Sequence, residues 1–237
     1  MRPKTGGGKA TVLAPEGRHH FRFLSLIMLG TVTDKKFTYE KGPNKGKFVQ
    51  KEEVKLIFEL VNTNHVFDEA KGKQPFILSK TFTFSTNEKA NMRKFFESWK
   101  GKKYTEDDIA KFDMMNWFNS QFAGECVVAH ETSKKGKAFA VIHSVMALDK
   151  EERTKVKKLR NPQVCFRFDD EDTWPAFANL FSWDKERIQE SEEWKKFGKK
   201  ILAVCPEEEE AEGSSEEEDD EPAVDYSVPE GEDDAPY

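Results

Sequence analysis

The sequence predicts a mainly β protein with added helices (α+β), and three observations support this prediction. Residues 76–84 alternate large apolar and polar side chains with a period of two, which is typical of a half-buried strand. Directly afterwards, an apolar stripe appears at helical spacing, formed by Met92, Phe95, Phe96 and Trp99. Two strand-like stretches precede this strand-to-helix unit, and two follow it. The resulting order, β-β-β-α-β-β, is that of a five-stranded OB-type barrel.

The elements before this unit are interpreted in chain order. Residues 1–18 are rich in Gly and Pro and have little to bury, so we expect a flexible arm. The long apolar stretch 21–32 predicts the first strand. Residues 34–47 then predict a turn-rich basic loop with Gly-Pro-Asn-Lys-Gly at its tip. Residues 48–60 alternate in polarity and predict the second strand, and we expect 62–75 to be a polar connection.

Local signals predict where the helices begin and end. Ser85 and Glu88 are spaced as a capping box, which predicts that the first helix begins there, and Gly101 provides a C-terminal stop. Thr105 and Asp108 predict a second N-cap, followed by a short apolar helix over the open end of the barrel.

The remaining elements complete the barrel and extend it. Stretches 122–129 and 138–148 predict strands four and five, joined by a short basic hairpin at 132–137. The predicted barrel core is 19–149. Residues 150–205 predict a basic linker, an edge strand at 164–168 and helices at 174–181 and 184–197 that pack on the core, with Ile188, Trp194 and Phe197 as anchors. Residues 206–237 predict a disordered acidic tail.

The two signs of charge are segregated along the chain. The net charge is −6, from 38 Lys and Arg against 44 Asp and Glu, but residues 207–237 contain 16 acidic residues and no basic one. The rest therefore carries all 38 basic residues against the remaining 28 acidic ones, about +10. A basic body with an acidic tail indicates a polyanion binder with a built-in competitor, although a tail that only solubilises the protein fits the same composition.

Other classes of protein find little support in the sequence. No apolar run reaches membrane-spanning length and no signal peptide is visible, so we expect a cytoplasmic protein without a membrane partner. The widely spaced Cys126, Cys165 and Cys205 indicate reduced packing residues, and Cys126, His130 and His143 fit no zinc signature. We find no catalytic constellation and expect no cofactor or metal.

Basic and aromatic residues interleave at the positions where an OB-type barrel binds its ligand. That site lies on the strand 2–3 face, between loops 1–2 and 4–5, and a single strand needs cations for phosphates and aromatic faces for bases. Strand alternation predicts that Lys55 and Lys80 reach a barrel surface. In a turn-rich loop, Phe37 and Tyr39 favour stacking over core packing. The loop candidates are Lys35, Lys36, Phe37, Tyr39, Lys41, Lys45, Lys47, Phe48, Lys134, Lys135, Lys137 and Phe139.

The succession FRFLSLIMLGTVTDKKFTYEKGPNKGKF, EVKLIFEL, KQPFILSKTFTFS with NMRKFFESWKGKKYT, FAGECVVAH with KGKAFAVI, and NPQVCFRFD resembles OB-fold single-stranded DNA-binding proteins of DNA phages. The resemblance covers about residues 20–197 and implies single-stranded DNA as the ligand, in the host-cell cytoplasm. The acidic tail with its terminal aromatic is similar in plan to that of the bacteriophage T7 single-stranded DNA-binding protein. That similarity implies a partner-binding role, toward replication or recombination proteins, for Glu232, Asp233, Asp234 and Tyr237.

These expectations define a leading hypothesis and two alternatives. The leading one is a non-enzymatic single-stranded DNA-binding protein that supports phage DNA replication or recombination. The first alternative is an adaptor whose groove binds protein, which predicts no polyanion affinity. The second is a recombination-associated nuclease, which would need clustered carboxylates and a metal. The sequence leaves oligomeric state open, with a homo-oligomer among the alternatives.

Overall fold

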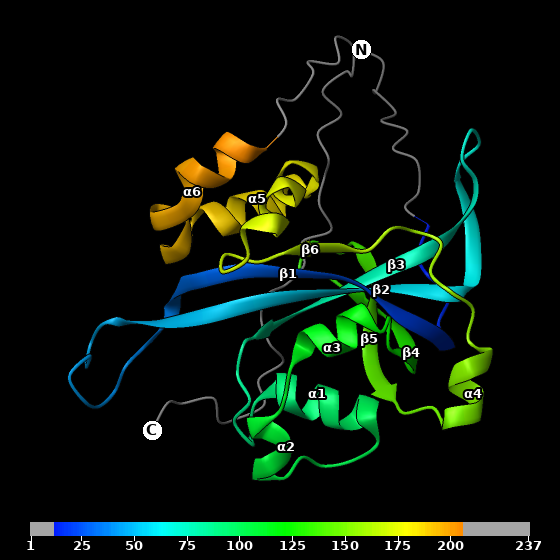
Figure 1. The fold of residues 1–237 in the computed structure, drawn as a ribbon, viewed down its shortest axis with the longest axis horizontal. Helices are drawn as coiled ribbons and strands as arrows, with labels where there is room; N and C mark the ends of the chain where they lie inside the picture. Colours follow the sequence, from blue (N-terminus) through cyan, green and yellow to red (C-terminus); the bar gives the residue numbers. More distant parts are fainter. Residues whose placement is uncertain (1–11, 206–237) are drawn as a thin grey trace.

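One curled sheet organises residues 12–205, the part of the chain that the computed structural model describes. Its strand order is β3-β2-β1-β4-β5, with every neighbouring pair antiparallel, and β6 pairs in parallel with β1. The sheet curls into a half-barrel with helices on both sides (Figure 1), which confirms the mainly β, α+β prediction. The strands are β1 (Gly17–Thr38), β2 (Phe48–Asp68), β3 (Gly72–Thr83), β4 (Ala123–Thr132), β5 (Ala138–Met146) and β6 (Val164–Phe166).

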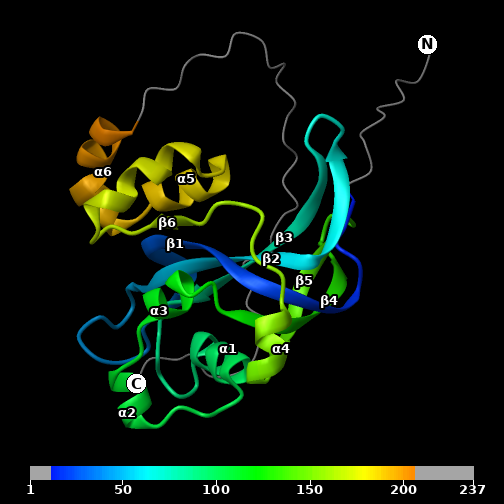
Figure 2. The same ribbon diagram turned by 45° about the vertical axis from the view of Figure 1, so that its right-hand side comes forward.

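The middle of strand β1, residues 21–32, is a nearly continuous apolar run because both of its faces are buried. Phe21 and Phe23 belong to a first core on the inner side of the curl. Leu24, Ile27 and Leu29 belong to a second core on the outer side. The first side is covered by α1–α3 and the second by the C-terminal helices (Figures 1 and 2), so the sheet is the middle of three layers.

The first core is centred on α1 (Asn91–Lys100), whose apolar stripe is confirmed. Trp99 is fully buried, and its ring centroid lies 5.0 Å from that of Phe21 and 5.6 Å from that of Phe58. The rings of Phe58 and Trp99 pack edge-to-face, an arrangement that adds stability beyond the area buried. Gly101 ends the helix in the left-handed conformation, with φ of 73°, as predicted. The layer is completed by α2 (Glu106–Ala110) and α3 (Met114–Asn119).

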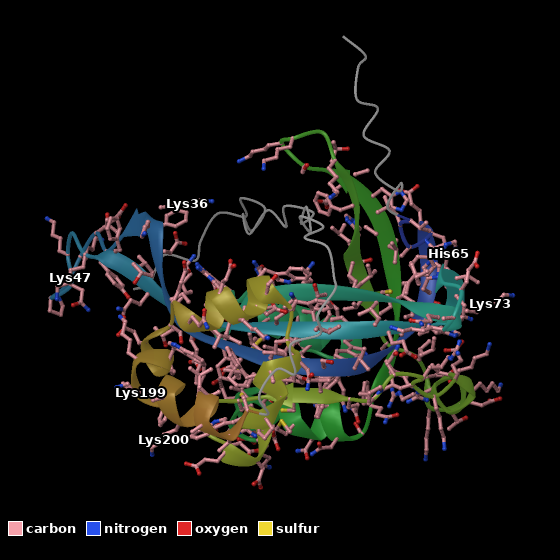
Figure 3. All side chains as sticks on the ribbon, turned by 90° about the horizontal axis from the view of Figure 1, so that it is seen from above. Lys36, Lys47, His65, Lys73, Lys199 and Lys200 are labelled. Carbon is pink, nitrogen blue, oxygen red and sulfur yellow. The ribbon has the colours of Figure 1, made fainter. Side chains whose placement is uncertain are left out.

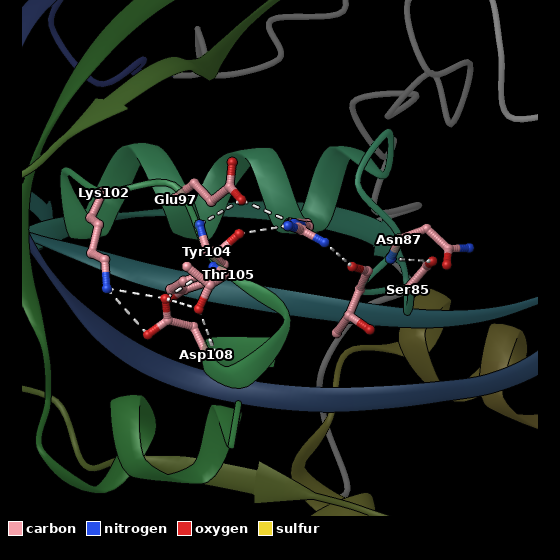
Figure 4. A network of polar contacts seen from close by, with 9 residues as sticks. Ser85, Asn87, Glu97, Lys102, Tyr104, Thr105 and Asp108 are labelled. Atoms are coloured by element: carbon pink, nitrogen blue, oxygen red, sulfur yellow. Dashed lines mark hydrogen bonds and ion pairs between the residues drawn. The ribbon is translucent and has the colours of Figure 1, made fainter. Parts of the chain in front are cut away.

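The start of α1 differs from the prediction. Ser85 and Glu88 do not form a capping box, because the Ser85 hydroxyl accepts from the Asn87 amide at 3.3 Å and closes a local turn (Figure 4). The N-cap is Ala90, which offers no side-chain acceptor. The box of Thr105 and Asp108 is confirmed at α2.

A polar network fastens the loop after α1 (Figure 4). Glu97 Oε1 accepts from Arg93 Nε and from the Tyr104 amide, both at 2.9 Å. Arg93 also donates to the carbonyls of Thr86 and Tyr104. Burial of Glu97 raises the pKa of its carboxyl, but the hydrogen bonds from Tyr104 and Arg93 outweigh it, and the net pKa is lowered. The carboxylate therefore has a structural role.

The second core lies under a C-terminal layer that covers the outward faces of β1 and β2. This layer contains the 3-10 helix η1 (Glu171–Asn179), α5 (Ser182–Gln189) and α6 (Glu192–Val204), and it follows α4 (Lys150–Lys155). Ile188 is fully buried in it, and Trp194 and Phe197 pack against it half-buried, as expected of anchors. The predicted 164–168 strand is the short β6, beside Ser25–Ile27.

Polar contacts hold α6 to the bulge in β1. Gly30 has φ of 85°, and a Cβ atom placed on it would lie 2.7 Å from Glu193 Oε2 and from Ser191 Cβ. Glu193 accepts from the Thr31 amide at 2.6 Å and from its hydroxyl at 2.8 Å. A glycine at this bulge therefore lets the start of α6 sit directly on the strand.

The hairpins are longer than predicted. β1 and β2 stay paired from Phe21↔Leu60 out to Thr38↔Phe48, so the predicted loop 34–47 is strand up to Thr38. β2 continues to Asp68 and β3 begins at Gly72, so the predicted connection 62–75 is also a hairpin. β1 already begins at Gly17, inside the predicted arm. Among residues 12–205, no helix is long and apolar enough to cross a membrane.

Candidate nucleic-acid interface

The most basic projecting element is the outer part of the β1–β2 hairpin, residues 33–51, here called the β1–β2 arm. Six lysines lie in it against two acidic residues. Phe37 is 57% exposed and Phe48 is 50% exposed, while Tyr39 is half-buried. Exposed aromatic rings among cations are the composition of a single-strand site. The lysines predicted to contact phosphate here are all exposed: Lys35, Lys36, Lys41, Lys45 and Lys47.

Backbone pairing makes the tip of the arm a defined turn. The Tyr39 amide donates to the Lys47 carbonyl, and the Gly46 amide donates to the Tyr39 carbonyl, both at 2.9 Å. Nearer the sheet, Lys51 Nζ lies 5.0 Å from the centroid of the Phe37 ring and 3.2 Å from Asp34 Oδ2. This contact orients Phe37 while leaving more than half of it open to a ligand.

The second predicted loop is the tip of the β4–β5 hairpin. Lys134 and Lys135 are exposed there, next to Gly136 with φ of 79°, whereas Lys137 and Phe139 are half-buried. In Figure 3 this hairpin rises away from the long axis of the sheet, while Lys36 and Lys47 lie at one end of that axis. The two loops are therefore separate basic projections that border one side of the sheet.

The expectation that Lys55 reaches an open barrel surface is wrong. Lys55 is only 6% exposed, and its Nζ lies 2.7 Å from Oδ1 of the fully buried Asp184 on α5. Burial raises the pKa of the Asp184 carboxyl, and the charge and hydrogen bond of Lys55 oppose that effect. Alternation correctly predicts that Lys55 projects from the outward face of β2, away from the first core. The C-terminal layer covers that face, so the side chain does not reach solvent.

The surface position expected for Lys80 needs a similar correction. Lys80 lies on the same face of β3 as Phe82, and its Nζ donates to the Ile142 carbonyl of β5 at 3.1 Å. The side chain is half-buried, and burial lowers the pKa of its ammonium. This contact links β3 to β5 at the seam where a closed barrel would pair the two strands.

Only one strand of the predicted strand 2–3 face is open. The outward face of β2 is covered, since Glu53 pairs with Arg187 at 3.0 Å and Glu59 accepts from the amides of Arg160 and Asn161. The neighbouring face of β3 is not covered in this way, and Ile77 on it is 49% exposed. The same face presents the polar side chains of Ser79, Thr81 and Thr83.

Sequence reasoning missed the aromatic residues at the far end of the sheet. On the β2–β3 hairpin, Phe67 is 49% exposed and its ring centroid lies 5.0 Å from that of His65. Lys71 and Lys73 are exposed nearby. Figure 3 shows His65 and Lys73 at the opposite end of the long axis from the β1–β2 arm. The adjacent apolar residues Val66 and Phe67 were the only local signal of this strand, and the polar composition of 62–75 predicts a loop.

Several predictions lie beyond these residues or concern other chemistry. The tail residues Glu232, Asp233, Asp234 and Tyr237 lie outside the described residues. Within residues 12–205, no group of three His, Cys, Asp or Glu side chains is placed to hold a metal ion. Burial raises the pKa of the Cys126 thiol to about 12, as suits a packing residue.

No protein-family model matches this chain, and no curated protein matches it in sequence.

Proposed function

We propose that this chain is a non-enzymatic single-stranded DNA-binding protein built on an OB-type barrel. The observation that carries the proposal is the β1–β2 arm, a hairpin with five exposed lysines at 35, 36, 41, 45 and 47 beside the exposed rings of Phe37 and Phe48. Flexible cations neutralise phosphates, and aromatic faces stack on bases without reading their sequence.

The DNA path follows from what is covered and what is open. Because α5 and residues 160–161 cover the outward face of β2, the DNA strand crosses the sheet over β3. Lys36 and Lys47 of the arm lie toward one end of this path, and Lys73 of the β2–β3 hairpin lies toward the other (Figure 3). Duplex DNA binds less well, because its bases are already stacked and cannot reach aromatic side chains.

The acidic tail is part of the proposal. Tethering gives the tail an effective concentration of about a millimolar, so even weak attraction to the basic body competes with DNA. DNA binding releases the tail, whose Asp233, Asp234 and Tyr237 then contact replication or recombination proteins of a phage. Both attractions are electrostatic, so salt weakens the competition as well as DNA binding.

One observation favours a second candidate function, an adaptor that binds protein. Val66 and Phe67 are 41% and 49% exposed at the end of the β2–β3 hairpin, and adjacent exposed apolar residues often mark protein contacts. An adaptor of this kind would use the hairpin end and would not need the lysines of the arm.

Equilibrium binding of labelled oligonucleotides to the full-length chain tests the proposal. We expect single-stranded DNA to bind more tightly than duplex of the same length. If about 4–6 phosphates are neutralised, log K should fall against log salt with a slope near −3 to −4. The 1–206 chain should bind several-fold more tightly at low salt. Tighter binding to duplex, or an affinity that salt does not change, would contradict the proposal and favour the adaptor.

A further inference from the structure

Two aromatic rings at the start of α5 form a parallel stack on the protein surface. The centroids of Phe181 and Trp183 lie 4.6 Å apart, with 6° between the ring planes. Phe181 is 58% exposed, which is the largest exposed fraction among the exposed large apolar side chains of residues 12–205. One face of the Phe181 ring is covered by Trp183, so the exposure falls on its other face and edge.

The stack lies beside the open face of β3. Lys55 Nζ lies 5.7 Å from the centroid of the Trp183 ring. Lys55 stands directly opposite Thr81 in the β2–β3 ladder, and residues paired in this way project from the same face of a sheet. Trp183 therefore borders the part of β3 that carries Ser79 and Thr81.

The second core does not require the Phe181 ring. Trp174, Phe177 and Ile188 are at most 3% exposed and fill the space between α5 and the sheet. Phe181 is the N-cap residue of α5 but makes no side-chain capping hydrogen bond. Neither packing nor capping thus explains a large apolar ring at this exposed position.

Taken together, this geometry leads us to infer that Phe181, supported by Trp183, is a stacking platform for a nucleobase of single-stranded DNA. The inference deepens the proposed function and rests on it. A base fits better than an apolar protein side chain because the Phe181 ring is already stacked in parallel on Trp183, and because the stack borders the polar Ser79 and Thr81 on β3. Along β2, Lys51, which contacts the Phe37 ring at the base of the arm, is four residues from Lys55, or about 13 Å, so the arm and the stack lie within reach of one DNA strand.

The test compares two oligomers of about 16 nucleotides, the upper size of a site on one OB-type fold. One is oligothymidylate, and the other is an abasic oligomer with the same phosphates. Phe181→Ala in the full-length chain should weaken oligothymidylate binding by about five- to 150-fold, the range for loss of one stacked base. Its salt slope and its binding to the abasic oligomer should stay as in the wild type.

Two further variants control for structure. Phe181→Tyr keeps the ring and should bind within about twofold of the wild type. Leu202→Ala removes another apolar side chain, 55% exposed on α6, and should change neither affinity nor thermal stability. If Phe181→Ala binds oligothymidylate as the wild type does, or loses equal affinity for both oligomers, the platform is refuted. If the wild type itself fails to bind oligothymidylate at low salt, the proposed function falls, and the inference falls with it.

Discussion

The buried ion pair between β2 and α5 provides a sharp test of how the C-terminal layer is attached. Lys55→Met keeps most of the side-chain volume but leaves Asp184 without its cation. Asp184 is fully buried, its Oδ1 is 2.7 Å from Lys55 Nζ, and its Oδ2 has no hydrogen-bond partner within the described chain. We therefore expect a large loss of stability and no specific effect on DNA binding by the folded protein.

The size of the loss follows from the burial of both groups. Removing one member of a buried pair costs about 3–5 kcal/mol, because the other charge stays buried and unpaired. Domains of this size are stable by only about 5–15 kcal/mol, so the change is a large fraction of the total. In urea, with an m value near 2 kcal/mol/M, the midpoint should fall by about 2 M, measured by tryptophan fluorescence.

The pH dependence separates lost charge pairing from lost packing. Burial already raises the pKa of Asp184 above its usual 3.8, and removal of Lys55 should raise it further. When the pKa of a carboxyl is higher in the folded than in the unfolded state, its ionisation destabilises the folded protein. This loss of stability is complete at a pH above the folded-state pKa, and it disappears as the pH falls to the unfolded-state pKa. The difference between Lys55→Met and the wild type should therefore be largest at pH 7 and shrink toward pH 4.

A paired variant is the control. Lys55→Met with Asp184→Leu replaces both charges by apolar groups, and it should recover most of the lost stability. A loss below about 1 kcal/mol for Lys55→Met, or a loss that is the same at pH 7 and pH 4, would refute the buried ion pair. A smaller salt slope in folded Lys55→Met would instead restore Lys55 as a phosphate contact.

Three further predictions concern the β1–β2 arm, the contact between α6 and β1 at Gly30, and the loop after α1. Replacing both Lys45 and Lys47 by Ala should reduce the salt slope for single-stranded DNA by about 1.4, at about 0.7 for each phosphate, and an unchanged slope would exclude the tip of the arm from the site. Gly30→Ala should lower the free energy of unfolding in urea by at least about 1–2 kcal/mol, because φ at Gly30 is positive and Glu193 and Ser191 occupy the space of a Cβ atom. Wild-type stability of this variant would contradict the close contact of α6 with β1. Glu97→Gln should lower stability most above pH 4.5 and least in acid, because a lowered folded-state pKa stabilises only the ionised form. Parallel unfolding curves from pH 7 to pH 3 would contradict this account.

Local sequence patterns predicted well the elements around the first core, on β3 and α1–α3. The alternation of 76–84, the apolar stripe ending at Trp99, the stop at Gly101 and the capping box at Thr105 all depend on residues close in sequence. Each of these signals has one dominant physical cause, either burial on one face or the satisfaction of helix-end amides. They could therefore be read without knowledge of the tertiary structure.

The C-terminal layer and the outer parts of the hairpins could not be predicted in the same way, because they depend on contacts between segments that are distant in sequence. Lys55 pairs with Asp184 across 129 positions, and no local pattern shows that a charged residue on a strand will be covered. The sequence places Phe181 at the end of a helix that packs on the core, whereas its ring is exposed in the structure. The sequence predicts loops at 34–47 and 62–75 where the structure has hairpins, because strands with polar residues on both faces lack apolar alternation.

The most direct test of the account is photocrosslinking of the full-length chain to oligothymidylate that carries 5-iodouracil, with the crosslinked residues mapped by mass spectrometry. We expect crosslinks at the exposed rings that border the open path, at Phe37 and Phe48 on the β1–β2 arm and at Phe181 on α5. The covered segment 53–59 of β2 should give none. Crosslinks confined to the end of the β2–β3 hairpin, or an absence of crosslinks when binding is saturated, would contradict a single strand lying across the arm and β3.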